Sequence, residues 1–114
     1  MDINTLINQH LNWKAMVESL FNDANCNSIN PTTFGRDSGC ELGKWIYSPA
    51  TECLSSNKTF VDLKKAHKEF HLHAGQILMD FKSGNAHKAQ IRMPMFRKSA
   101  DDVITLLLEL KNDI

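Results

Sequence analysis

Residues 60–81, FVDLKKAHKEFHLHAGQILMDF, carry the pattern that decides the fold. Core-type side chains recur along this stretch at alternating spacings of three and four residues, which places them on one face of an α-helix. Ser83-Gly84-Asn85 follows, and Gly84 is expected just past the helix end. We therefore predict a long helix that packs into a bundle along a stripe of Phe60, Leu63, His67, Phe70, Ala74, Ile77 and Phe81.

A second stripe with the same spacing runs through residues 3–24 and predicts another long helix. One of its core positions is a histidine, His10, just as His67 interrupts the first stripe. The members of this second stripe are Ile3, Leu6, His10, Trp13, Val17, Leu20 and Ala24.

Two more helices are expected, one short and one long. Ser38-Gly39-Cys40-Glu41 fits a capping box, with Ser38 as N-cap, so a short helix should follow as far as Ile46. The turn-forming stretches 25–37 and 48–57 read as connections. The last helix should begin near Ala86 and be distorted near Pro94. Its core face would carry Phe96, Val103, Leu106, Leu107 and Leu110.

Strand patterns are weak throughout, so the chain is predicted to be all-α: a bundle of three long helices and one short helix. Its 114 residues suit a single domain spanning positions 1–114. The composition, with 42% hydrophobic and 23% charged residues, is that of an ordinary soluble domain.

The charge balance and the cysteine content limit which binding partners and which cellular compartment we expect for this protein. Thirteen basic residues balance thirteen acidic ones, which argues against nucleic acid or an acidic membrane surface as partner. No apolar run approaches the roughly 20 residues of a membrane span, and the first residues do not resemble a secretory signal. Three cysteines, an odd number, do not suggest a disulfide framework, so we expect a cytoplasmic protein.

The histidines suggest a metal site. His67 and His71 are four residues apart and project from one face of their helix, so two imidazoles can reach one ion. His10 occupies a core position of another helix. A hydrogen-bonded core histidine is the simpler interpretation for each alone. Three together favour a shared cation, because one ion satisfies several buried imidazoles at once.

Cys40 is the expected fourth ligand, since the first turn of the short helix favours a thiolate, which zinc prefers. The alternative is a small buried apolar residue, and this is the interpretation for Cys26 and Cys53. His73 lies off the stripe and is expected to face solvent, and His87 is expected at the surface; none of these four is assigned a role.

Three histidines and one cysteine suit a single tetrahedral Zn²⁺ per chain, bound by His10, Cys40, His67 and His71. No carboxylate occupies a stripe position, which argues against a hemerythrin-like di-iron protein. The set also leaves no position for a reactive water, so we predict no enzyme activity.

Three blocks of sequence, taken together, resemble bacterial chemoreceptor zinc-binding (CZB) domains. They are His10-Leu-Asn-Trp13, Cys40-Glu-Leu-Gly43-Lys-Trp45 and His67-Lys-Glu-Phe70-His71. The resemblance implies a four-helix fold with an additional short helix that carries the cysteine. It also implies one zinc ion per protomer on the four matching residues. Members are usually homodimers, often fused to chemoreceptor or diguanylate cyclase domains. This chain shows no output domain and is expected to be a free-standing member or a fragment.

Two functions compete at this point. A sensory or regulatory domain of chemotaxis or cyclic-di-GMP signalling would respond to zinc, to oxidation of Cys40 or to pH. In a structural module, zinc would only stabilise a small bundle that presents a dimerisation or docking surface. The run Leu106, Leu107, Leu108 and Leu110 exceeds one core face and suggests a homodimer contact, unless this helix is buried on two sides within its own bundle.

Overall fold

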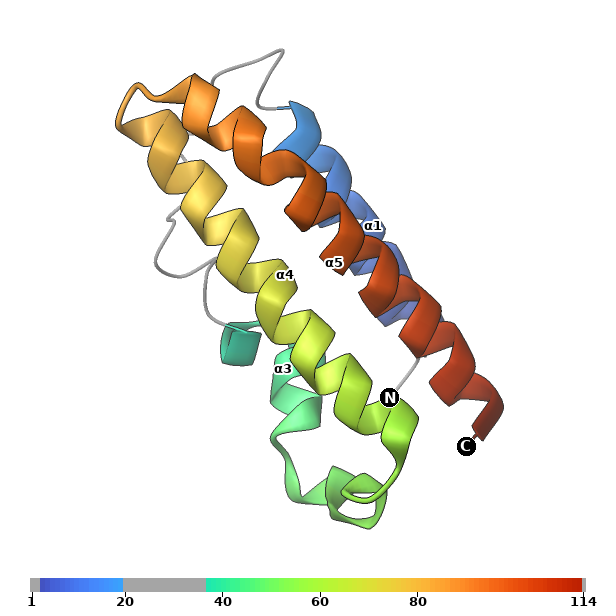
Figure 1. Cartoon of the computed structure of the whole chain (residues 1–114). Coiled ribbons are helices and arrows are strands. Elements are labelled where there is room, and N and C mark those ends of the chain that lie inside the picture. Colours follow the sequence, from blue (N-terminus) through green and yellow to red (C-terminus); the bar gives the residue numbers. More distant parts are fainter. Residues whose placement is uncertain (1–2, 20–36, 114) are drawn as a thin grey trace.

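The computed structural model describes residues 3–19 and 37–113, and every regular element within these ranges is helical. Figure 1 shows the arrangement. In the described residues, no helix combines the length and the hydropathy that a membrane span requires. The all-α prediction is therefore confirmed for this part of the chain. In chain order the elements are α1 (Ile3–Ser19), the 3₁₀ turn η1 (Asp37–Gly39), α3 (Glu41–Ile46), the 3₁₀ helix η2 (Pro49–Leu54), α4 (Lys58–Lys82) and α5 (Ala86–Asp113).

A tight turn joins α4 to α5 and makes the two long helices antiparallel (Figure 1). Gly84 has a φ of 77°, the left-handed conformation that glycine adopts without steric cost. Its N–H donates to the carbonyl of Phe81 at 3.1 Å, and the N–H of Asn85 donates to that of Asp80 at 2.8 Å. This pair of bonds is a Schellman motif, and it confirms the predicted role of Gly84.

The core forms where α1 lies along the α4–α5 pair, parallel to α4 and opposite in direction to α5 (Figure 1). Phe70 of α4 stacks on Phe96 of α5, with ring centroids 5.2 Å apart. Burial of each such side chain contributes about 1.5–3 kcal/mol. The predicted stripes supply most of the buried side chains, among them Ile3, Leu6, Val17, Phe60, Leu63, Ala74, Ile77, Val103, Leu107 and Leu110.

The start of the short helix differs from the prediction. Ser38 does not cap it; Cys40 is the N-cap residue of α3, and Glu41 is the first helical residue instead of the third. The capping-box prediction was therefore wrong, because residues 37–39 form their own 3₁₀ turn and delay the helix by two positions.

Other boundaries also shift. The expected loop 48–57 contains η2. Pro94 lies inside α5, which continues through it, so the helix is confirmed and the distortion stays a prediction. The predicted end of the first helix, residues 20–24, lies outside the described residues.

Candidate metal centre

Helix α4 presents His67 and His71 to the core from successive turns. Asn57 caps the start of this helix by accepting a hydrogen bond from the N–H of Phe60 at 3.0 Å. The two imidazole centroids lie 4.6 Å apart, and both side chains are buried. As predicted from their spacing of four residues, both rings lie on one side of α4.

Helix α1 contributes His10, which is completely buried. Its ring centroid is 5.3 Å from that of His67 and 6.2 Å from that of His71. Nδ1 of His10 lies 2.8 Å from the carbonyl oxygen of Leu6. A carbonyl only accepts, so Nδ1 carries the proton and Nε2 presents its lone pair to the cluster. Among the described residues Nε2 has no hydrogen-bond partner.

The sulfur of Cys40 completes the group. It accepts a hydrogen bond from the N–H of Gly43 at 3.3 Å, as a capping side chain does at a helix N-terminus. The same Sγ lies 3.1 Å from Nε2 of His67. Cys40 is half-buried, whereas the three histidines are buried. The difference concerns the residue as a whole, because all four members of the cluster are buried at their ligating groups.

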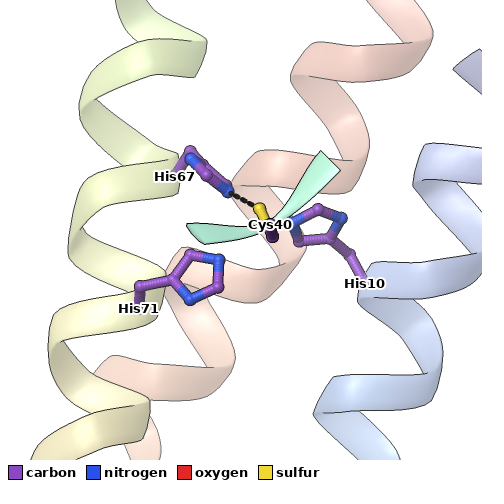
Figure 2. Close-up of side chains that lie close together, drawn as sticks. All are labelled: His10, Cys40, His67 and His71. Atoms are coloured by element: carbon purple, nitrogen blue, oxygen red, sulfur yellow. Dashed lines mark hydrogen bonds between the residues drawn. The ribbon is translucent and has the colours of Figure 1, made fainter. Parts of the chain in front are cut away.

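One ligand atom from each of His10, Cys40, His67 and His71 lies within 4.8 Å of the other three (Figure 2). Zinc bonds of about 2.0–2.1 Å to nitrogen and 2.3 Å to sulfur set the edges of a tetrahedral site at roughly 3.3–3.6 Å. The observed group is therefore close to the required size, and small side-chain rotations would close it around an ion. The structure brings together all four residues that the sequence predicted.

Burial sets the charge state of the cluster. Desolvation lowers the pKa of His10 to about 4, although the hydrogen bond to the Leu6 carbonyl opposes the shift. Desolvation, with the neighbouring His71 and His10, lowers the pKa of His67 to about 2. Both imidazoles are thus neutral at pH 7, the form that binds metals. Burial raises the pKa of the Cys40 thiol, partly offset by the Gly43 N–H. A bound divalent cation would reverse that effect and stabilise the thiolate.

The donor set fits a zinc ion. Unpartnered buried nitrogens cost free energy, and in the described residues Nε2 of His10 and Nδ1 of His67 are such atoms. An ion bonded to Nε2 of His10 removes that cost at one position. Three imidazoles and a thiolate also match the tetrahedral preference of zinc.

Aromatic rings surround the cluster. Trp13 meets His10 edge to face with centroids 4.9 Å apart, and Phe70 lies 5.3 Å from His10 and 5.1 Å from His71. Packing of these rings against the imidazoles leaves less space for water beside them and restricts rotation of the imidazole planes. The role of Phe70 at the site could not be inferred from the sequence, where its position in the stripe identifies only a core residue.

Among the described residues, Cys53, His73 and His87 lie outside the cluster. Cys53 is exposed, so the expectation of a small buried residue was wrong; η2 turns its side chain outward. His73 is half-buried between α4 and α5, so it does not simply face solvent as predicted. His87 is exposed, as expected. Cys26 lies outside the described residues.

Comparison with known protein families finds a match to a zinc-binding domain. The chemoreceptor zinc-binding domain model matches residues 10–78, a span that contains all four residues of the cluster. Searches of curated proteins and of solved structures found no match. The match covers more than half of the chain and includes each block that motivated the resemblance. The chain therefore belongs to the chemoreceptor zinc-binding (CZB) domain family.

Proposed function

We propose that this chain binds one zinc ion through His10, Cys40, His67 and His71, and that it acts as a sensory or regulatory domain in bacterial signalling of the chemotaxis or cyclic-di-GMP type. The observation that carries the proposal is the convergence of four ligand atoms within 4.8 Å from three separate segments of the chain. Membership of the CZB family supports zinc as the metal.

The arrangement suits regulation because its ligands lie on elements that can move relative to one another. His10 belongs to α1, His67 and His71 belong to α4, and Cys40 caps α3. Occupancy by a metal ion would fix the distances among these three elements, and loss of the ion would release them. We propose no catalytic role, since four protein ligands complete a tetrahedral shell and leave no position for substrate.

The half-buried position of Cys40 supports a response to oxidants. In this step the thiolate of Cys40 attacks hypochlorous acid, and the net products are a sulfenic acid and chloride. Sulfur is oxidised and chlorine is reduced. The oxidised sulfur is a poorer ligand, so the site would lose one of its four bonds.

A structural role is the second candidate, and the complete burial of His10 and His67 favours it. A purely structural ion would staple α1 to α4, and the protein would unfold when the metal is removed. A sensor requires a folded metal-free state and an affinity within the range of free zinc in the cell. Circular dichroism of the chelated protein, together with a competitive zinc titration, separates the two functions.

Metal analysis of the purified chain tests the site itself. We expect one equivalent of zinc in the wild type and its loss in Cys40→Ala and in His71→Ala. Cys53→Ala and His87→Ala are matched controls, because both residues are exposed and lie outside the cluster. Full zinc content in Cys40→Ala and His71→Ala would refute the proposed ligand set.

We propose that the chain forms a homodimer. Each protomer would have the four-helix architecture with an additional short helix, and the dimer would act with a bacterial signalling partner in the cytoplasm. The leucine run that suggested the dimer contributes mostly to its own core: Leu107 and Leu110 are buried, Leu106 packs against the core, and Leu108 is 49% exposed. Support comes instead from exposed apolar side chains on α4 and α5, among them Leu72, Met79, Ile91 and Met95. Sedimentation showing a monomer at micromolar concentration would contradict the dimer.

A further inference from the structure

The cysteine ligand is held differently from the histidines. His10, His67 and His71 each lie in a long helix that packs into the core. Cys40 lies between a three-residue 3₁₀ turn and a six-residue helix. Elements this short do not hold a side chain by their own stability. The position of Sγ must therefore depend on contacts that the segment 37–47 makes within itself and with its neighbours.

Gly43 makes the closest of these contacts. A Cβ atom added to Gly43 would lie 1.6 Å from the carbonyl oxygen of Asp37, 2.7 Å from its carbonyl carbon and 3.0 Å from the Cα of Ser38. All three are backbone atoms, so no side-chain rotation relieves the overlap. The positive φ in the described residues belongs to Gly84, so residue 43 is glycine for reasons of space. The absence of a side chain lets η1 close onto the first turn of α3.

The same contact directs the sulfur. The N–H of Gly43 donates to Sγ of Cys40 at 3.3 Å, and the carbonyl oxygen of Asp37 lies 3.8 Å from that sulfur. Both groups belong to the two backbone segments that touch at Gly43. If they separate, the sulfur loses its neighbour in the Asp37 carbonyl, and η1 no longer holds the turn that directs it toward Nε2 of His67, which is 3.1 Å away.

Tyr47 closes the other end of this segment. Its hydroxyl donates a hydrogen bond to the carboxylate of Asp37, and its backbone N–H donates to the carbonyl of Gly43 at 3.1 Å. The Nζ of Lys64, on α4, lies 5.1 Å from the centroid of the Tyr47 ring, within the range of a cation–π contact. Tyr47 thereby ties η1 to the end of α3, and Lys64 ties both to the helix that carries His67.

We propose that Asp37, Gly43 and Tyr47 are positioning residues that form a clamp on Cys40 and hold its sulfur toward the three histidines before a metal ion binds. The inference rests on the proposed zinc site and explains a feature of it: a ligand on two short elements still lies 3.1 Å from its neighbour. Preorganisation of this kind raises affinity, because binding then orders less of the protein. Supporting groups behind metal ligands typically contribute 10–100-fold in affinity.

The test is a titration with cobalt(II) and zinc of the full chain and its variants. Cobalt reports sulfur ligation through a thiolate-to-cobalt charge-transfer band, whereas its visible bands report metal bound by any ligands. For Gly43→Ala we expect cobalt bound by histidines with a weakened charge-transfer band, and a zinc affinity lower by about 10–100-fold. Tyr47→Phe, at a side chain 48% exposed, should fold normally and show a smaller fall of up to about tenfold.

Gly84→Ala is the matched control. It also replaces a glycine by alanine and should destabilise the protein, since its φ of 77° disfavours any side chain, but nothing lies within 4 Å of the added methyl group. Its charge-transfer band and zinc affinity should equal those of the wild type. A loss of both in Gly84→Ala would show that general destabilisation explains the effect, and would overturn the clamp.

The variant Cys40→Ala distinguishes a failure of the clamp proposal from a failure of the zinc-site proposal. If Cys40→Ala loses the charge-transfer band while Gly43→Ala and Tyr47→Phe both match the wild type, the clamp is refuted and the zinc site stands. If Gly43→Ala does not fold, Tyr47→Phe decides, and unchanged zinc affinity in that variant refutes the clamp. If the charge-transfer band is absent from the wild type, or is equally strong in Cys40→Ala, then Cys40 does not bind the metal and the proposed zinc site itself is refuted.

Discussion

Nδ1 of His10 donates a hydrogen bond to the carbonyl oxygen of Leu6, one turn earlier in the same helix, at 2.8 Å. This bond selects the imidazole tautomer, because the carbonyl can only accept. Nε2 of His10 is then the basic nitrogen, and it is the atom left to act as ligand in the group that His10 forms with Cys40, His67 and His71. A backbone group of α1 thus prepares the ligand before any metal arrives.

Zinc should stabilise the folded chain. An ion that binds the native state alone adds about 2.7 kcal/mol to the free energy of unfolding when its concentration is 100 times its dissociation constant. We expect the melting temperature to rise with added zinc and to fall on chelation. Differential scanning calorimetry of the wild type beside Cys40→Ala measures this. Equal melting temperatures with and without zinc would contradict metal binding to the native state.

The metal-free protein should lose stability in acid. Folded-state pKa values of about 4 for His10 and about 2 for His67 lie below the ordinary value of 6.5, so the unfolded chain binds more protons below pH 6.5. Stability from neutral burial is therefore complete above pH 6.5 and is lost as pH falls, down to about pH 4 for His10 and about pH 2 for His67. The slope should approach about 1.4 kcal/mol per pH unit for each histidine. Urea unfolding at several pH values checks this, and a flat profile between pH 6.5 and 4 would refute it.

His67→Leu should abolish zinc binding and yet stabilise the metal-free protein. The side chain is completely buried, and in the described residues its Nδ1 has no hydrogen-bond partner. Replacing a buried polar ring by an apolar side chain of similar size removes a desolvation cost of about 1–3 kcal/mol. We expect a gain of about 1 kcal/mol in urea unfolding without zinc, after some loss of packing. Destabilisation by several kcal/mol would instead show that the imidazole itself supports the core.

Asn57→Ala should weaken the fold without changing the metal site. Asn57 caps α4 by accepting from the N–H of Phe60, and loss of such a cap costs about 1 kcal/mol. Chemical unfolding measures the loss, and a zinc titration of the same variant should give the wild-type affinity. Asn57→Ser keeps the capping oxygen and should recover most of the stability. A large fall in zinc affinity would mean that the register of α4 depends on this cap.

Oxidation with one equivalent of hypochlorous acid should release zinc through Cys40. Cys26 and Cys53 are further thiols that compete for the oxidant, so the experiment uses the double variant Cys26→Ser, Cys53→Ser as the starting protein. Zinc release is followed with a colorimetric chelator, and the sulfenic acid at Cys40 by mass spectrometry. Zinc retained while Cys40 is oxidised would rule out the redox response.

Helical periodicity made the histidines predictable. A residue in a stripe with spacings of three and four must face the core whatever the rest of the chain does, so the amino-acid pattern alone places His10 and His67 inside the bundle. The spacing between His67 and His71 is likewise a property of one helix. Convergence of the two helices required only that both stripes share a core.

The surroundings of Cys40 could not be predicted in the same way. Ser38 and Glu41 fit a capping box as a local pattern, but the tertiary contact between Asp37 and Gly43 selects a later helix start. Gly43 is compatible with a close approach of another segment, but the residue type alone does not identify Asp37 as the residue that approaches. The exposure of Cys53 was missed for a related reason, because short 3₁₀ segments such as η2 lack a periodicity that assigns an inner face.

The spacing of the ligands along the chain has a consequence for the unfolded state. An ion held by His10, Cys40 and His67 would join points about 30 residues apart and close the chain into two consecutive rings. Gathering the ligands of one such ring in the unfolded chain costs conformational entropy worth about 3–4 kcal/mol, so the ion binds the folded chain, in which this cost is already met. Ligands gathered on a single helix would enclose only one turn. Placed as they are, four side chains allow a single ion to restrict the topology of more than half of the polypeptide.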